Sequence, residues 1–161
     1  YKYIKKKIGK LKMKDLQNKK LSSDRVAIVA SIVAKDKKIR KLVHAFQVEC
    51  AYNPPKKYDG SCLDGRDCGS VVVKDADVKF YINASLKVRA SRRYKELKTK
   101  NKKITYKEVL KSIRKRDKSD KNRKISPLKK TKDMVLLNSS SESISSCFIK
   151  IKKIIDRKIN N

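Results

Sequence analysis

The chain has 161 residues, which is enough for one domain and short for two. Lys and Arg number 46 against 16 Asp and Glu, so the formal net charge is +30, and a charge of this size attracts polyanions such as nucleic acid, anionic membranes and nucleotides. The cations are spread over every segment, which favours solvated lysine-rich faces over a dedicated polyanion-binding surface. Because no apolar run is long enough to span a bilayer, we expect a soluble, cytoplasmic protein.

The four cysteines and the one histidine do not form a metal-binding pattern. No two of the cysteines have the Cys-x-x-Cys spacing, and there is only one histidine; the residues are Cys50, Cys62, Cys68, Cys147 and His44. Structural zinc sites need four such ligands at characteristic spacings. We therefore expect free thiols and no structural zinc.

The first quarter of the chain changes its pattern near residue 22. Residues 1–21 alternate loosely between apolar residues and lysine, with Gly9 among them, and this predicts a small exposed β-hairpin. From Ser23 the apolar residues fall at helical spacing, with a polar break at residues 35–38. Two helices in a hairpin are predicted, and the second ends before Pro54.

A short apolar approach leads to Asp-Gly-Arg-Asp at residues 64–67, with three valines at residues 71–73. Such a turn places charged groups at the carboxyl end of a strand, where open α/β sheets bind ligands. Asp-Gly is also a common turn signal, so a polar surface turn is the alternative. The stretch is therefore a candidate site.

Strands and helices alternate in the rest of the chain. Residues 78–82 predict a buried strand, Ser85 can cap a helix over residues 86–98, and Thr105 with Glu108 forms a capping-box pair that opens a further helix. That helix leads into a highly charged segment at residues 116–123. An apolar strand at residues 134–137 and a last helix after a Ser-rich stretch complete the pattern. The alternation predicts an α/β fold with a mainly parallel sheet, of which three strands are visible.

Two separated motifs give the chain a resemblance to a known family. They are Asp64-Gly65-Arg66-Asp67-x-Gly69-x-Val71-Val72 and Arg116-Asp117-x-x-Asp120-x-x-Arg123-x-x-x-Pro127-Leu128, accompanied by Asp75-Ala76-Asp77-x-Lys79 and Arg89-Ala90-x-Arg92-Arg93. In order and spacing the chain resembles the bacterial cytidylate kinase family over most of residues 21–156. The resemblance implies a P-loop nucleoside-monophosphate-kinase-like parallel sheet with flanking helices. It also implies transfer of a phosphoryl group from ATP, with Mg²⁺, to CMP or dCMP.

The resemblance assigns substrate-binding roles to individual residues. Ser31 and Arg40 resemble the residues that read the cytosine edge, with Asp67 completing that recognition. Arg66 and Arg123 resemble the pair that binds the CMP phosphate. The phosphate-binding role suits arginine, because guanidinium groups bind phosphate oxygens in pairs and stay charged at any working pH.

Further roles concern the sugar, the metal and a lid. Asp120, positioned with help from Arg116, resembles the acid that accepts hydrogen bonds from the sugar hydroxyls. Arg92 and Arg93, again with Arg116, would belong to the lid over the ATP phosphates, and Asp64 would hold magnesium through water. Arg66, Arg116, Arg123 and Asp64 form the catalytic set in this assignment.

The resemblance also implies a division into three parts. Residues 1–58 would be the remainder of the CMP-binding domain, with the hairpin and two helices. Residues 59–98 and 128–161 would form the core α/β domain, and residues 99–127 the lid region. A monomer is expected.

The main departure from the family is the lack of a Gly-x-x-x-x-Gly-Lys-Ser/Thr stretch in these 161 residues, the loop that cradles the ATP phosphates. The chain is therefore expected to be the carboxyl-terminal portion of a cytidylate kinase, without the first strand and the P-loop and incomplete as an enzyme. A partial sequence of an intact enzyme and a decayed gene both account for this. Two other functions stay open: a nonfunctional remnant that still binds CMP, and a basic protein that binds nucleic acid non-specifically through its charge.

Overall fold

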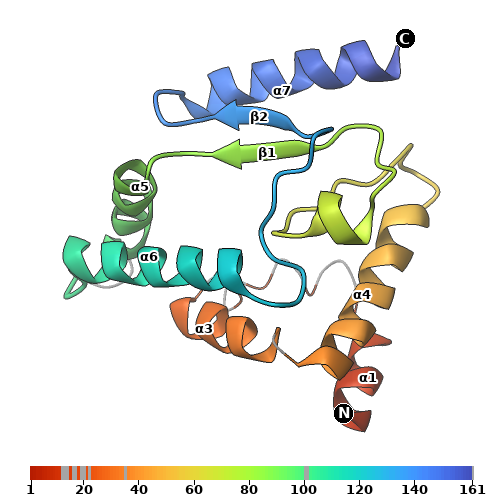
Figure 1. The fold of residues 1–161 in the computed structure, drawn as a ribbon, viewed down its shortest axis with the longest axis horizontal. Helices are drawn as coiled ribbons and strands as arrows, with labels where there is room; N and C mark the ends of the chain where they lie inside the picture. The colour runs from red at the N-terminus through yellow and green to blue at the C-terminus, as the bar shows by residue number, and fades with distance from the viewer. Residues whose placement is uncertain are drawn as a thin grey trace. The chain divides into compact units, whose positions relative to one another are not determined.

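The computed structural model describes residues 1–11, 15, 18, 21, 23–34, 36–99 and 102–160 (Figure 1). Contacts within the chain divide it into two compact units, Tyr1–Gly65 and Arg66–Asn161. Each unit is described by itself below. The three-part domain division stays a prediction. Across the described ranges, no helix has both the length and the apolar character needed to cross a membrane.

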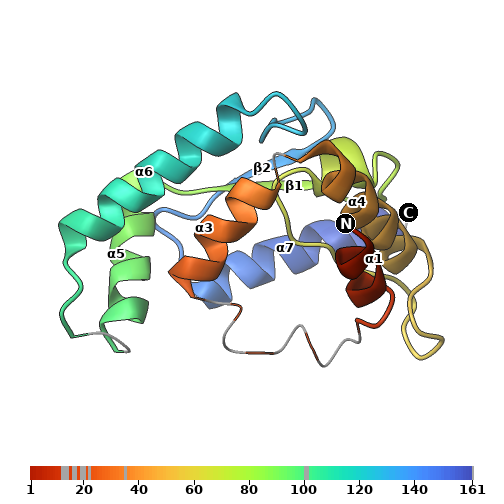
Figure 2. The ribbon, with the colours of Figure 1, turned by 90° about the horizontal axis from the view of Figure 1, so that it is seen from below.

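The first unit is helical, with α1 (Lys2–Ile8), α3 (Asp24–Val33) and α4 (Lys37–Tyr52). Helix α1 packs against α4 (Figure 2). The predicted β-hairpin is wrong for residues 2–8, and the rest of that prediction lies largely outside the described residues. The reason is the spacing of Ile4 and Ile8, the two half-buried residues of α1, because positions i and i+4 share one face of a helix.

The two helices predicted after Ser23 are confirmed, and side-chain caps explain where they begin. Ser23 Oγ accepts from the Val26 amide at 3.3 Å. Asp36 Oδ1 accepts from the amides of Lys38 and Ile39 at 2.8 and 2.9 Å. Such oxygens satisfy amides that have no partner within the first turn of a helix. Helix α4 ends at Tyr52, close to Pro54 as predicted.

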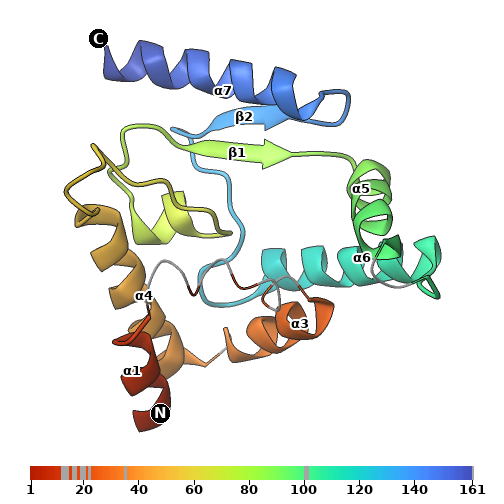
Figure 3. The same cartoon turned by 180° about the vertical axis from the view of Figure 1, so that it is seen from behind.

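The second unit contains a parallel sheet of two strands, β1 (Phe80–Asn83) and β2 (Val135–Asn138). The two strands lie side by side (Figure 3). The register pairs Phe80 with Val135 and Asn83 with Asn138. Helix α5 (Leu86–Lys98) follows β1, and α7 (Ile144–Ile159) follows β2. The predicted α/β class with parallel pairing is confirmed. Three strands were expected and two are found in the described residues; residues 60–63, before the Asp-Gly-Arg-Asp turn, form no strand.

The valine run after the turn forms a short π-helix, η2 (Cys68–Val72). The amide of Val72 donates to the Asp67 carbonyl at 3.2 Å, and that of Val73 to the Cys68 carbonyl at 2.8 Å. A Cβ on Gly69 would lie 3.0 Å from Met134 Cε and 3.3 Å from Lys79 Cδ. The turn therefore packs tightly against the residues that precede both strands, and a side chain at position 69 would require Met134 and Lys79 to shift.

Helix α6 (Tyr106–Asn122) packs against α5. Ala90 of α5 and Val109 of α6 are buried, and the rings of Tyr94 and Tyr106 meet edge to face with centroids 6.1 Å apart. The other buried apolar residues lie at the strand ends and in η2: Val72, Ala84, Met134 and Leu137. The capping box of Thr105 and Glu108 is present as predicted, which fixes where α6 begins.

Candidate functional site

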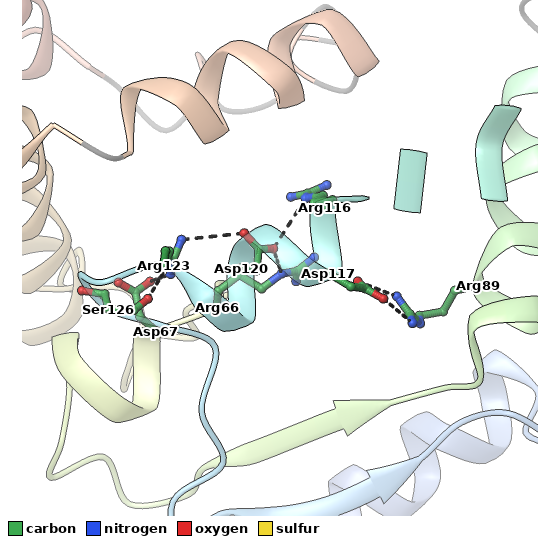
Figure 4. Close-up of polar contacts among 8 residues, drawn as sticks. All are labelled: Arg66, Asp67, Arg89, Arg116, Asp117, Asp120, Arg123 and Ser126. Atoms are coloured by element: carbon green, nitrogen blue, oxygen red, sulfur yellow. Dashed lines mark hydrogen bonds and ion pairs between the residues drawn. The ribbon is translucent and has the colours of Figure 1, made fainter. Parts of the chain in front are cut away.

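Two buried carboxylates form the centre of a polar cluster in the second unit (Figure 4). Asp67, just before η2, is 8% exposed, and Asp120, in the last turn of α6, is 7% exposed. Buried carboxylates are stable only where cations or hydrogen-bond donors accompany them. Here three arginines, Arg66, Arg116 and Arg123, supply that charge.

Arg123 lies between the two carboxylates. Its Nη2 is 3.8 Å from Asp67 Oδ1, and its Nη1 is 3.9 Å from Asp120 Oδ1. Its Nε donates a hydrogen bond to the Ser126 carbonyl. Ser126 has a φ of 49°, in the left-handed region that non-glycine residues seldom adopt. The turn after α6 thus aims a carbonyl at Arg123 and holds its guanidinium group in place.

Arg66 and Arg116 reach Asp120 from the solvent side. Arg66 Nε donates to Asp120 Oδ2 at 3.1 Å, and Arg116 Nε lies 3.7 Å from the same oxygen. The two arginine side chains are 43% and 51% exposed, whereas that of Arg123 is 13% exposed. Asp120 therefore orients two guanidinium groups that remain accessible to an anion.

Three guanidinium groups face two carboxylates, so the cluster has a formal net charge of +1. A phosphate group added beside the arginines would find donors already oriented. The arrangement fits phosphate binding, because planar guanidinium donors match phosphate oxygens in pairs. The sequence predicted Arg66, Asp67, Arg116, Asp120 and Arg123 as site residues, and the structure brings these five together.

Arg92 and Arg93, the predicted lid residues on α5, make contacts within the second unit. Arg92 donates to the carbonyls of Ser139 and Glu142 at 2.6 and 3.2 Å, so it anchors the turn between β2 and α7. Arg93 pairs with Glu96 at 2.8 Å. The Glu142 carboxylate accepts hydrogen bonds from Lys150 and Ser146, which hold its pKa below the usual range.

Three predicted site residues belong to the first unit. Ser31 lies in α3, Arg40 in α4 and Asp64 in the segment after α4. Arg40 Nε donates to the Ala34 carbonyl at 3.0 Å, across the junction between α3 and α4. Their roles toward cytosine and magnesium stay predictions. In the part of the chain that the structure describes, no three His, Cys, Asp or Glu side chains gather as a metal site.

Sequence reasoning missed two features of this region. The first is the carbonyl of Ser126, for which the sequence gives no signal, because any residue offers a carbonyl. The second is a bidentate pair between Arg89 of α5 and Asp117 of α6. Both residues stand in the quoted motifs, but the contact depends on how the two helices pack.

The parallel sheet, the flanking helices and the cluster of arginines and carboxylates are those of an α/β protein with a fold like that of the P-loop nucleoside monophosphate kinases. Comparison with protein-family models gives the particular family. The model described as cytidylate kinase matches residues 2–157. The chain belongs to the cytidylate kinase family.

Curated relatives support this assignment, and each carries the name cytidylate kinase. A relative from Clostridium botulinum (strain Okra / Type B1) is 43% identical over 143 residues, 88% of this chain and 65% of its own length. One from Clostridium tetani is 41% identical over 137 residues, 85% of this chain and 57% of its own. One from Thermosipho melanesiensis is 40% identical over 133 residues, 83% and 59% respectively. The chain thus spans less than two thirds of the relatives it matches.

Proposed function

We propose that the protein to which this chain belongs transfers the γ-phosphoryl group of ATP to CMP or dCMP, giving CDP or dCDP. In that reaction an oxygen of the CMP phosphate bonds to the γ-phosphorus, and the bond from that phosphorus to the β,γ-bridging oxygen breaks. Such transfers are catalysed mainly by positioning and by neutralising charge. The cluster of Arg66, Arg123, Asp67 and Asp120 is the observation that supports this proposal.

In this proposal the residues of the cluster bind different parts of CMP. Arg66 and Arg123 bind the CMP phosphate and reduce its negative charge, so that two anions can approach one another. Asp120 accepts hydrogen bonds from the sugar hydroxyls. Asp67 holds Arg123 from the other side and completes the recognition of cytosine.

Other roles rest on the resemblance to the family. Ser31 and Arg40 would read the cytosine edge, and a site that hydrogen-bonds one base rejects a base that leaves its polar groups unpaired. Arg92, Arg93 and Arg116 would contribute to the lid over the ATP phosphates. Magnesium, if bound, would neutralise phosphate charge, with Asp64 held to it through water.

Binding of CMP to the folded chain, measured by isothermal titration calorimetry, tests the phosphate site. We expect Arg123→Ala to weaken binding of CMP and UMP alike by about 10- to 100-fold, the range for hydrogen bonds to charged groups. Arg66→Ala is a milder variant, because Arg66 is 43% exposed. Arg114→Ala is the matched control. It removes an exposed arginine from α6, the helix that ends next to Arg123, and should leave CMP binding unchanged.

Unchanged CMP affinity in folded Arg123→Ala and Arg66→Ala would contradict the phosphate site. Comparable affinity of the unmutated chain for CMP and UMP would contradict the roles of Asp67 and Arg40 in base reading. Transfer is measured separately, as CDP formation with ATP, magnesium and an added P-loop segment from a related kinase. Loss of transfer is then distinguishable from loss of binding.

The net charge of +30 favours a second function, non-specific binding of nucleic acid. Such binding would weaken steeply with salt and would show no preference for CMP. A single-stranded DNA that binds tightly at low salt, with no competition by CMP, would support this alternative. Competition by CMP at equal ionic strength would favour the kinase site.

A further inference from the structure

We propose that Arg89 and Asp117 are positioning residues, which fix the carboxyl-terminal half of α6 and thereby orient Asp120 toward the CMP sugar and Arg123 toward the CMP phosphate. The inference rests on the proposed function for the identity of the ligand. The contacts from which it is argued all lie within the second unit. Among the described residues, the hydrogen bonds and ion pairs of the Asp120 carboxylate are with Arg66, Arg116 and Arg123 and not with Arg89 or Asp117, so we expect both residues to act through the helix.

The contact is bidentate and joins three elements. Arg89 Nη1 donates to Asp117 Oδ1 at 2.9 Å, and Nη2 donates to Asp117 Oδ2 at 2.7 Å. Arg89 Nε donates to the carbonyl of the buried Ala84 at 3.0 Å, just after β1. One planar side chain of α5 thus ties α6 to the end of the sheet (Figure 4).

Asp117 lies close along α6 to the residues of the cluster. It follows Arg116 directly and precedes Asp120 by three residues, about 4.5 Å along the helix axis. A rotation or slide of α6 at Asp117 would therefore move the carboxylate of Asp120. Arg123 follows at the end of the same helix and would move with it.

The aromatic contact between the same two helices lies at the other end of α6. Tyr106 is the first residue of the helix and meets Tyr94 edge to face. Eleven residues, or about 16 Å of helix, separate Tyr106 from Asp117. The aromatic pair therefore holds the start of α6, and the ion pair holds the half that carries the site.

A guanidinium–carboxylate pair suits this task because both groups are planar and two parallel hydrogen bonds fix their relative orientation. Both side chains are about one-third exposed, so the Coulomb attraction contributes little to stability. Lysine keeps the charge but has no planar fork. Arg89→Lys therefore separates orientation from charge.

The test uses the full chain and compares Arg89→Lys and Asp117→Asn with Tyr106→Leu, a control that perturbs the same pair of helices. We expect the first two variants to raise the dissociation constant for CMP about 5- to 20-fold, less than the loss of a direct hydrogen bond to the phosphate, because both residues act on the site only through α6. The double variant should bind no more weakly than either single variant, because both remove one interaction. Tyr106→Leu should lower stability and change CMP affinity less than about twofold.

A second measurement needs no nucleotide. In NMR spectra of the free chain, Arg89→Lys and Asp117→Asn should shift the Asp120 carboxyl carbon and speed exchange of the Arg123 Nε proton, whereas Tyr106→Leu should do neither. If these signals do not move in Arg89→Lys, the proposal is overturned, whatever the CMP result. If the unmutated chain binds no CMP while the signals move as expected, the proposed function fails and the positioning role stands.

Discussion

The nearly buried side chain of Lys79 contacts three separate segments of the second unit. Its side chain is 8% exposed, and Nζ donates to Asp133 Oδ2 and to the Lys74 carbonyl. Its stem also lies where a side chain on Gly69 would have to pass. The hydrogen bond from Lys79 is the main cause that lowers the pKa of Asp133 to about 2.

Acid titration should therefore reveal the contribution of Asp133. Because the folded pKa of about 2 is below the usual 3.8, the stabilisation is complete above about pH 4 and is lost as the pH falls toward 2. We expect Asp133→Asn to be less stable than the unmutated chain at pH 5, with a difference that shrinks as the pH is lowered. Urea unfolding at pH 5, 4, 3 and 2.5 measures this difference.

Asp59→Asn, at an exposed residue before the site turn, is the matched control. Its stability difference from the unmutated chain should stay small at every pH. A difference for Asp133→Asn that is independent of pH would show that the carboxylate contributes through packing and not through its charge.

Helix α6 shows at the scale of elements how one local signal fixes a boundary. The Thr105 amide donates to Glu108 Oε2 at 2.8 Å, and the Glu108 amide donates to Thr105 Oγ1 at 3.3 Å. The hydrogen bonds from Thr105 lower the pKa of Glu108. Both residues lie at the start of the helix whose other end carries the site.

Thr105→Ala should lower the free energy of unfolding by about 1 kcal/mol, the usual effect of removing a helix cap. Thr105→Ser keeps the hydroxyl and should stay close to the unmutated chain. Thermal unfolding followed by circular dichroism measures both, with an expected shift of a few degrees for Thr105→Ala. Equal melting temperatures for the two variants would show that the reciprocal hydrogen bonds contribute nothing in solution.

The sequence could predict the features of an element that depend on neighbouring residues, and it could not predict those that depend on distant contacts. Ser85 and Thr105 mark helix starts because their side chains act within three residues of the chain. Ile4 and Ile8 were misassigned because four-residue spacing fits loose alternation as well as a helix face. The valines of η2 favour a strand by propensity, but the structure has a π-helix there.

For the candidate site, the membership of the residues could be predicted but their individual contacts could not. The resemblance predicted that Arg66, Asp67, Asp120 and Arg123 belong to one site, although Arg66 and Asp120 lie 54 positions apart. It could not show which nitrogen faces which oxygen, because that depends on the packing of α6. For this reason the Arg89–Asp117 pair became visible only in the structure.

At the scale of the whole molecule, the net charge of +30 affects stability. In α6 the three acids Glu108, Asp117 and Asp120 are engaged in the cap, the pair with Arg89 and the cluster. The cations of the outer face of α6 are exposed: Lys107, Lys111, Arg114, Lys118 and Lys121. Mutual repulsion of such charges opposes the compact state.

Raising the salt concentration from about 0.05 to 0.5 M should therefore raise the melting temperature, because the screening length falls severalfold over this range. A variant with Lys107, Lys111, Lys118 and Lys121 changed to Gln should respond less steeply to salt. Differential scanning calorimetry with NaCl measures both slopes. A melting temperature that falls with salt in the unmutated chain would show that attractive pairs outweigh repulsion.

The parallel pairing of β1 with β2 also affects how the protein is made. Phe80 and Val135 are 55 positions apart, and synthesis proceeds at about 5–20 residues per second. Strand β1 therefore leaves the ribosome roughly 3–11 seconds before its partner exists. During that interval α5 and α6 can form and pack from local contacts, while the backbone groups of Tyr81 and Ile82 that later pair with β2 remain open to other chains.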